Sequence, residues 1–153
     1  MWRAIAFATL VSGTLDILMA TFLTLTFGRH VPDMLRFVAS GPFPSAIEMG
    51  AAGALLGLLV HFALMAIMAA LFVVMARNRP TLLERPILTG TAYGLVTYVV
   101  LDLIVVPLRF PGAFPPKPIS IVTQLFAHIV LVGITFAIIT RWTLSARATV
   151  QHA

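Results

Sequence analysis

The chain has 153 residues, of which 60% are hydrophobic and only 10% are charged, and its mean hydropathy is +1.04. This composition excludes an ordinary soluble domain and predicts an all-α integral membrane protein whose main partner is the lipid bilayer. The net charge of +5 comes from basic residues scattered singly, which predicts no nucleic-acid partner, and the absence of cysteine excludes disulfides, thiolate metal sites and cysteine nucleophiles.

The chain contains successive apolar windows that are long enough to cross a bilayer. A helix needs about 20 residues to do so. The four windows span approximately residues 4–27, 51–76, 87–107 and 119–140. The first carries Asp16 and is too long for a signal peptide, so we interpret it as a true span. We therefore expect a single domain, residues 1–153, folded as a four-transmembrane-helix bundle.

The first and third connections between spans are predicted to cap the same end of the bundle, which we call the outer end. In the first, "VPDMLRFVASGP", Pro32 can begin a short helix and Gly41-Pro42 can end it. Its apolar side chains would share one face, which is typical of a helix lying in the membrane interface: Met34, Leu35, Phe37 and Val38. The third connection, residues 107–118, holds five of the ten prolines and is expected to be stiff and extended.

Basic residues beside the spans predict the orientation, because cytoplasmic connections carry an excess of Lys and Arg. The side of the two termini has six of them: Arg3, Arg77, Arg79, Arg85, Arg141 and Arg147. The outer side has four: Arg29, Arg36, Arg109 and Lys117. The difference favours cytoplasmic N- and C-termini.

Each predicted span contains one Asp or His, in the order Asp16, His61, Asp102 and His128. A charged side chain at the bilayer centre costs about 2.5 to 3.5 kcal/mol or more, so these residues should face the protein interior. At roughly 1.5 Å per helical residue, all of them fall in the outer half of the membrane. We expect them to form one buried polar layer.

Small and polar residues recur at helical spacing, so that each span has one face suited to packing against another helix. The four stripes are Thr9, Gly13, Asp16, Ala20 and Thr24; Gly50, Ala54, Gly57 and His61; Thr91, Gly94, Tyr98 and Asp102; and Ser120, Gln124, His128 and Thr135. Tyr98 and Gln124 lie on the same faces as the ionisable residues. The candidate ligand or proton site is therefore Asp16, His61, Asp102, His128, Gln124 and Tyr98.

Short sequence matches relate the two halves of the chain. "LDIL" and "LDLI" occupy the first and third spans, while "HFAL" and "HIVL" occupy the second and fourth. The matches fit two parallel helix-pair repeats related by an axis along the membrane normal, and they also fit chance, since each is only four residues long.

Features of the last three spans resemble those of a known family. They are His61, the span end Val106-Pro107-Leu108, the loop sequence Phe114-Pro115-Pro116, and Gln124 placed four residues before His128. In these features about residues 55–142 are similar to the YagU-like inner-membrane proteins of domain of unknown function 1440. The resemblance implies a multi-pass protein of the bacterial inner membrane and implies no particular activity.

A layer of two carboxylates and two imidazoles predicts binding or translocation of protons or a small solute, because intramembrane ionisable groups commonly mark such pathways. One alternative is a structural or accessory membrane subunit, in which these residues only lock the helices together. Another is a b-type haem protein with His61 and His128 as axial ligands.

No hydrolase, phosphate-loop or metalloprotease motif occurs in the chain, so we expect neither an enzyme nor a catalytic residue. Met65 and Met68 follow His61 at helical spacing and could suggest soft Cu(I) ligands, although such methionines more often fill a core. The apolar outer faces leave a homo-oligomer or a larger membrane complex open.

Overall fold

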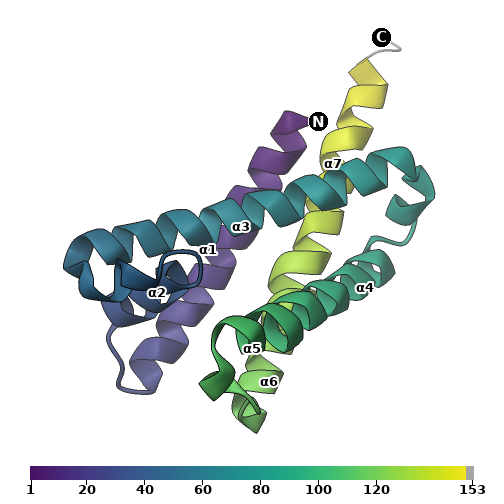
Figure 1. Ribbon diagram of the computed structural model, residues 1–153. Coiled ribbons are helices and arrows are strands. Elements are labelled where there is room, and N and C mark those ends of the chain that lie inside the picture. The colour runs from purple at the N-terminus through teal and green to yellow at the C-terminus, as the bar shows by residue number, and fades with distance from the viewer. Residues whose placement is uncertain (151–153) are drawn as a thin grey trace.

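Four long apolar helices make up the computed structural model, which describes residues 1–150 (Figure 1). They are α1 (Trp2–Thr26), α3 (Gly50–Asn78), a third span from Pro86 to Arg109 and a fourth from Pro118 to Leu144. The short 3₁₀ segment η2 (Pro80–Leu83) joins α3 to the third span. The predicted all-α fold with four membrane-spanning helices is confirmed.

The third and fourth spans are not continuous α-helices. The third consists of α4 (Pro86–Tyr98), the π-helical segment η3 (Val99–Val105) and α5 (Val106–Arg109). The fourth consists of α6 (Pro118–Phe126), the π-helical segment η5 (Ala127–Ile134) and α7 (Thr135–Val150). A π-helical turn bonds residues five apart and not four, which rotates the side chains relative to an α-helix. Asp102 lies in η3 and His128 lies in η5.

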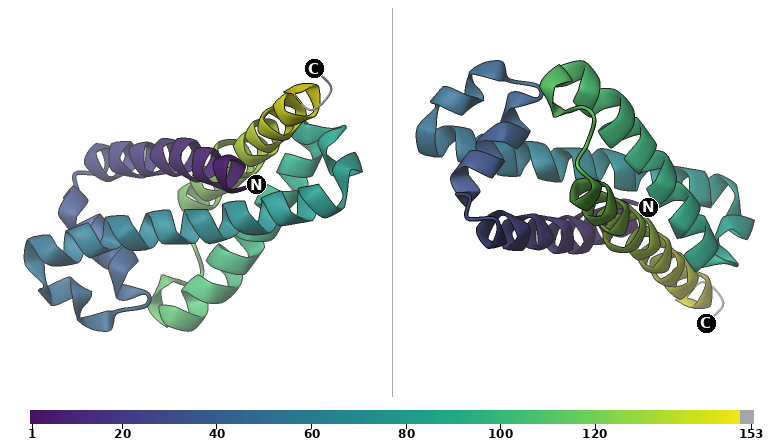
Figure 2. Two further views of the ribbon diagram at one scale, coloured as in Figure 1. Left: turned by 90° about the horizontal axis from the view of Figure 1, so that it is seen from above. Right: turned by 90° about the horizontal axis from the view of Figure 1, so that it is seen from below.

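The spans pack as two pairs. α1 lies against α3, and α4 lies against η5 and α7, as the two views of Figure 2 show. The pairs meet mainly where α1 contacts η5 and α7. The N- and C-terminal ends of the bundle lie at the same end of Figure 1, and the connection between α5 and α6 lies at the other end. This is the geometry that two predicted helix-pair repeats need, while their common origin stays a prediction.

The apolar core fills the half of the bundle nearest the termini. It gathers side chains from α1, α3, η5 and α7, and its members are Ala8, Met65, Met68, Ala69, Phe72, Ala76, Val132, Phe136 and Ala137. Phe72 and Phe136 are fully buried, and the ring of Tyr93 packs against both. Because aromatic rings fill this region, the inner half of the bundle is closely packed.

Glycines allow the backbones of the second pair to touch. Gly90 and Gly94 form a GxxxG pattern on α4, and a Cβ atom on Gly94 would overlap the carbonyl oxygen of His128. A Cβ atom on Gly133 of η5 would likewise overlap the carbonyl oxygen of Gly90. Such close approach is the usual reason for small residues at membrane helix interfaces. The position of His128 is therefore fixed through its own backbone.

The predicted short helix in the first connection is present as α2 (Val31–Ser40), followed by the 3₁₀ segment η1 (Pro44–Glu48). α2 packs along the flank of α3, where Gly57 lies against the backbone of Leu35. Gly57 is seven residues beyond the start of α3, roughly 10 Å below it. The amphipathic pattern predicted the helix correctly, and Gly57 of α3 provides its close packing surface, while Gly53 lies against Ala46 of η1. The location of α2 in the membrane interface stays a prediction.

The third connection is less extended than predicted, because Pro107 is accommodated inside the third span and the helix continues to Arg109. A 3₁₀ turn, η4 (Pro111–Ala113), follows it. Arg109 donates from Nε to the Gly41 carbonyl at 2.7 Å and from a terminal nitrogen to the Ser40 carbonyl at 2.9 Å. Phe110 stacks on Phe37 of α2, with ring centroids 4.5 Å apart. These contacts fasten α2 to α5 at the outer end.

Candidate functional site

Asp102 and His128 form a close pair between η3 and η5. The Nε2 atom of His128 lies 3.0 Å from Oδ2 of Asp102, and its Nδ1 atom lies 2.9 Å from the hydroxyl oxygen of Thr97. The Thr97 hydroxyl also lies 2.9 Å from the carbonyl oxygen of Gly94. Both ring nitrogens of His128 thus have a partner at hydrogen-bonding distance.

The Thr97 hydroxyl has one proton to donate. When it donates to the Gly94 carbonyl, its oxygen accepts from Nδ1–H of His128, and Nε2 then shares one proton with Asp102. A pair that shares one proton in this way, as an imidazolium with a carboxylate or as an imidazole with a carboxylic acid, has no net charge, which suits a membrane interior.

Asp16 and His61 form a looser pair between α1 and α3. The Nε2 atom of His61 lies 2.9 Å from the carbonyl oxygen of Gly13, which requires a proton on that nitrogen. The Nδ1 atom therefore faces Asp16, at 3.9 Å from Oδ2. This distance is too long for a hydrogen bond, although it is short enough for a strong charge interaction. We call Asp16 and His61 the first pair and Asp102 and His128 the second pair, in chain order. The second pair is closed by a hydrogen bond and the first is not.

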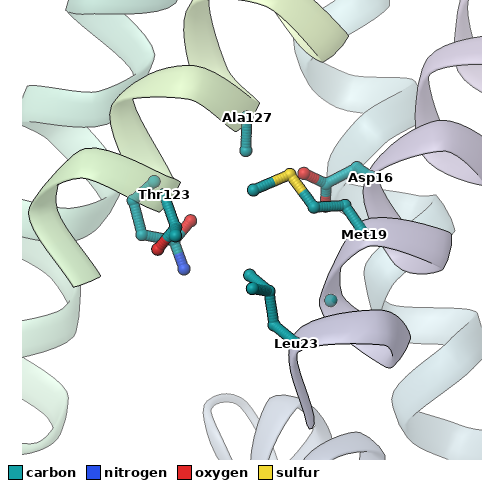
Figure 3. Close-up of a pocket in the computed structure, with 7 residues that line it drawn as sticks. Asp16, Met19, Leu23, Thr123 and Ala127 are labelled. Carbon is teal, nitrogen blue, oxygen red and sulfur yellow. The ribbon is translucent and has the colours of Figure 1, made fainter. Parts of the chain in front are cut away.

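A pocket of about 70 Å³ opens beside Asp16, between α1 and α6 (Figure 3). Asp16, Met19 and Leu23 come from α1, and they face Thr123 and Ala127 across the pocket. Ala20 and Gln124 complete the lining. Among the described residues, the Gln124 amide has no hydrogen-bond partner in the protein. The pocket therefore has a carboxyl group and an unpaired amide on facing helices.

The structure brings the predicted ionisable residues together as two Asp–His pairs within the predicted polar layer. Gln124 lines the pocket next to Asp16, as its place on the stripe suggested. Tyr98 has a buried ring beside that of His128, with centroids 6.1 Å apart. The functional assignment of these six residues stays a prediction.

Thr97 was missed by the analysis of helical stripes. Five residues separate it from Asp102, which places them about 140° apart on an α-helix. The π-helical segment η3 changes this register, so both side chains reach His128. Ser12 was missed as well, and its hydroxyl donates to the Leu131 carbonyl inside η5. No pattern in the sequence marks either π-helical segment in advance.

The haem and copper alternatives stay predictions. The nitrogens of His61 face Gly13 and Asp16, and those of His128 face Thr97 and Asp102, so a haem iron would have to displace one of these partners from each ring. Met65 and Met68 belong to the apolar core. Among the described residues, no three His, Asp or Glu side chains are grouped as a metal site.

No family model, curated protein or solved structure matches the chain. The resemblance to the YagU-like proteins therefore stays a prediction, and the function has to be argued from the geometry of the site.

Proposed function

We propose that this protein binds or translocates protons or a small solute at its Asp–His layer, with Asp16 and His61 as the exchanging pair. The observation that supports this most is the difference between the pairs. The side chains of Asp16 and Asp102 are equally exposed, at 22%, but Asp102 lies 3.0 Å from its histidine, whereas Asp16 lies 3.9 Å from its histidine, without a hydrogen bond, and lines a pocket. A partly unsatisfied ionisable group beside a cavity is suited to exchange.

The pocket supplies the chemical means of exchange. Asp16 can accept or release a proton next to Nδ1 of His61, which is 3.9 Å away. A solute in the pocket would meet the carboxyl group on one side and the Gln124 amide on the other. Neither group is an activated nucleophile, so we propose binding or transfer without covalent catalysis.

A structural or accessory role is the second candidate, and one observation favours it. Three of the four imidazole nitrogens have a protein partner within 3.0 Å, which is how a buried polar layer that only fixes helix register would be built. In this case the protein would act with other copies of itself or within a larger membrane complex, through the exposed apolar faces of its helices.

We further propose that the chain resides in the bacterial inner membrane with both termini in the cytoplasm. The six basic residues on the side of the termini, against four on the outer side, support this orientation. The resemblance to the YagU-like proteins supports the choice of membrane.

Proton flux into liposomes containing an internal pH dye tests the proposal. Liposomes with the wild-type protein should dissipate an imposed pH gradient faster than empty liposomes. Asp16→Asn should lower that proton flux about tenfold or more, because the exchanging pair loses its carboxyl group. Asp33→Asn, which changes an exposed carboxylate on α2, is the matched control and should leave the flux unchanged. Equal flux in the folded Asp16→Asn variant and the wild type would exclude Asp16 as the exchanging group.

A further inference from the structure

The two halves of the bundle differ in their access to solvent. The pocket begins at Asp16 and continues past Ala20 to Leu23, which is three residues from the outer end of α1. On the facing helix it reaches Thr123, five residues from the outer end of α6. Asp16 itself is ten residues, or about 15 Å, from the end of α1. The cavity therefore extends from the polar layer toward the outer end.

The opposite direction is closed. Directly inward of the layer lie Met65, Phe72 and Phe136, all buried in the apolar core. Phe72 and Phe136 have no exposed surface. These side chains fill the space between the helices in the inner half.

The pocket is too small for most metabolites. Sites for drug-sized ligands enclose about 300 to 1,000 Å³, and a water molecule occupies about 30 Å³ of the liquid. A volume of about 70 Å³ fits a few waters or one solute of similar size. The Thr123 hydroxyl donates to a backbone carbonyl of its own helix, so toward the pocket its oxygen is an acceptor, as the oxygens of the Asp16 carboxyl group are. The Gln124 amide offers both a donor and an acceptor. Acceptors therefore predominate in the lining, which favours a solute that donates hydrogen bonds.

We propose that the pocket is a one-sided, water-filled entrance from the outer end, which admits to Asp16 only hydrogen-bond donors of about the size of water. Water, hydronium and ammonium belong to this class. The inference rests on the proposed function for Asp16 and adds to it the size class of the solute and the side from which it enters. Met19 and Leu23 provide the apolar walls that exclude larger molecules.

Because the chain has no cysteine, single cysteines can test this inference without a background. Ala20→Cys places a thiol in the pocket. Leu18→Cys places a thiol on the exposed face of the same helix that is turned away from the bundle, about 3 Å away along the helix axis. Ala137→Cys places a third thiol in the buried apolar core. Each variant in liposomes is treated with silver ions, which are thiol-reactive and small, and the remaining thiols are counted by polyethylene-glycol maleimide after denaturation.

Silver added on the outer side should block the thiol of Ala20→Cys more than about tenfold faster than the thiols of Leu18→Cys and Ala137→Cys. The reason is that a thiol ionises to the reactive thiolate readily only in contact with water. The much larger trimethylammonium-ethyl methanethiosulfonate should leave Ala20→Cys unmodified. Equal silver rates at residues 18 and 20, or faster reaction from the side of the termini, would overturn the inference. Thiol labelling does not depend on proton flux, so the two proposals can fail separately. If silver labels Ala20→Cys as expected but Asp16→Asn leaves the flux unchanged, only the proposed function is refuted.

Discussion

The two Asp–His pairs use the same residue types on corresponding helices, yet they are built differently. Asp102 and His128 are joined at 3.0 Å, and Thr97 holds the other ring nitrogen. Asp16 and His61 remain 3.9 Å apart, next to a pocket. The difference indicates that paired residues inside a membrane can serve opposite purposes, because the surrounding backbone decides whether a polar contact is closed or left available.

The backbone around each pair explains this difference. Gly94 places the α4 backbone directly on the carbonyl of His128, and the π-helical segments bring Asp102 and Thr97 to the same ring. Around the first pair, the nearest neighbour of Gly13 is the Phe62 side chain, which can rotate away. The second pair is thus rigid and the first is adjustable.

Alanine at the two glycines should give the largest effect on stability. Gly94→Ala puts a methyl group into the His128 carbonyl, and backbone atoms cannot yield, so we expect a loss of about 3 kcal/mol in the free energy of unfolding. Gly13→Ala meets Phe62 Cε1 at 2.7 Å and should cost about 1 kcal/mol or less after this ring moves. Unfolding in mixed micelles by increasing dodecyl sulfate measures both. Equal losses would show that the pairs are equally rigid.

Removal of each imidazole should give the next largest difference between the pairs in the free energy of unfolding. His128→Ala leaves the partly buried Asp102 and the buried Thr97 hydroxyl without this partner, with an expected loss of about 2 kcal/mol. His61→Ala should cost about 1 kcal/mol, because Asp16 can be hydrated from the pocket. The same micelle titration compares them, and a larger loss for His61→Ala would reverse the assignment of fixed and exchanging pairs.

The threonine hydroxyls provide a finer comparison. Thr97→Val removes the partner of His128 Nδ1 and should lower the free energy of unfolding by about 1 kcal/mol. Thr123→Val removes a hydroxyl that bonds only carbonyls of its own helix, so we expect a change within about 0.5 kcal/mol. If the two variants unfold alike, Thr97 does not hold the ring of His128.

The smallest expected effect concerns the fastening between α2 and α5. Arg109→Gln loses the hydrogen bonds to Ser40 and Gly41, but the site is exposed, so the loss should be about 0.5 kcal/mol. Proteolysis of the first connection should nevertheless become faster, because α2 is less firmly held. Unchanged cleavage kinetics would show that the packing of α2 on α3 is sufficient.

Much of the fold could be predicted from hydropathy, since a run of about 20 apolar residues has few alternatives to a membrane helix. The stripes containing Asp16 and Gln124 were also informative, because α1 and α6 are regular there and residues keep α-helical spacing. The inequality of the pairs could not be foreseen. It depends on two π-helical segments and on backbone contacts at Gly94, which arise from tertiary packing and leave no periodic signal in the chain.

Infrared spectroscopy of the protein in liposomes tests most directly whether Asp16 exchanges protons while Asp102 does not. We predict one carboxyl band, in addition to those of the exposed Asp33 and Glu48, that responds within the dead time to a pH change on the outer side. It should be absent from Asp16→Asn and present in Asp102→Asn. A responsive band that survives Asp16→Asn and disappears with Asp102→Asn would contradict the account, because the closed pair would then be the one in contact with solvent.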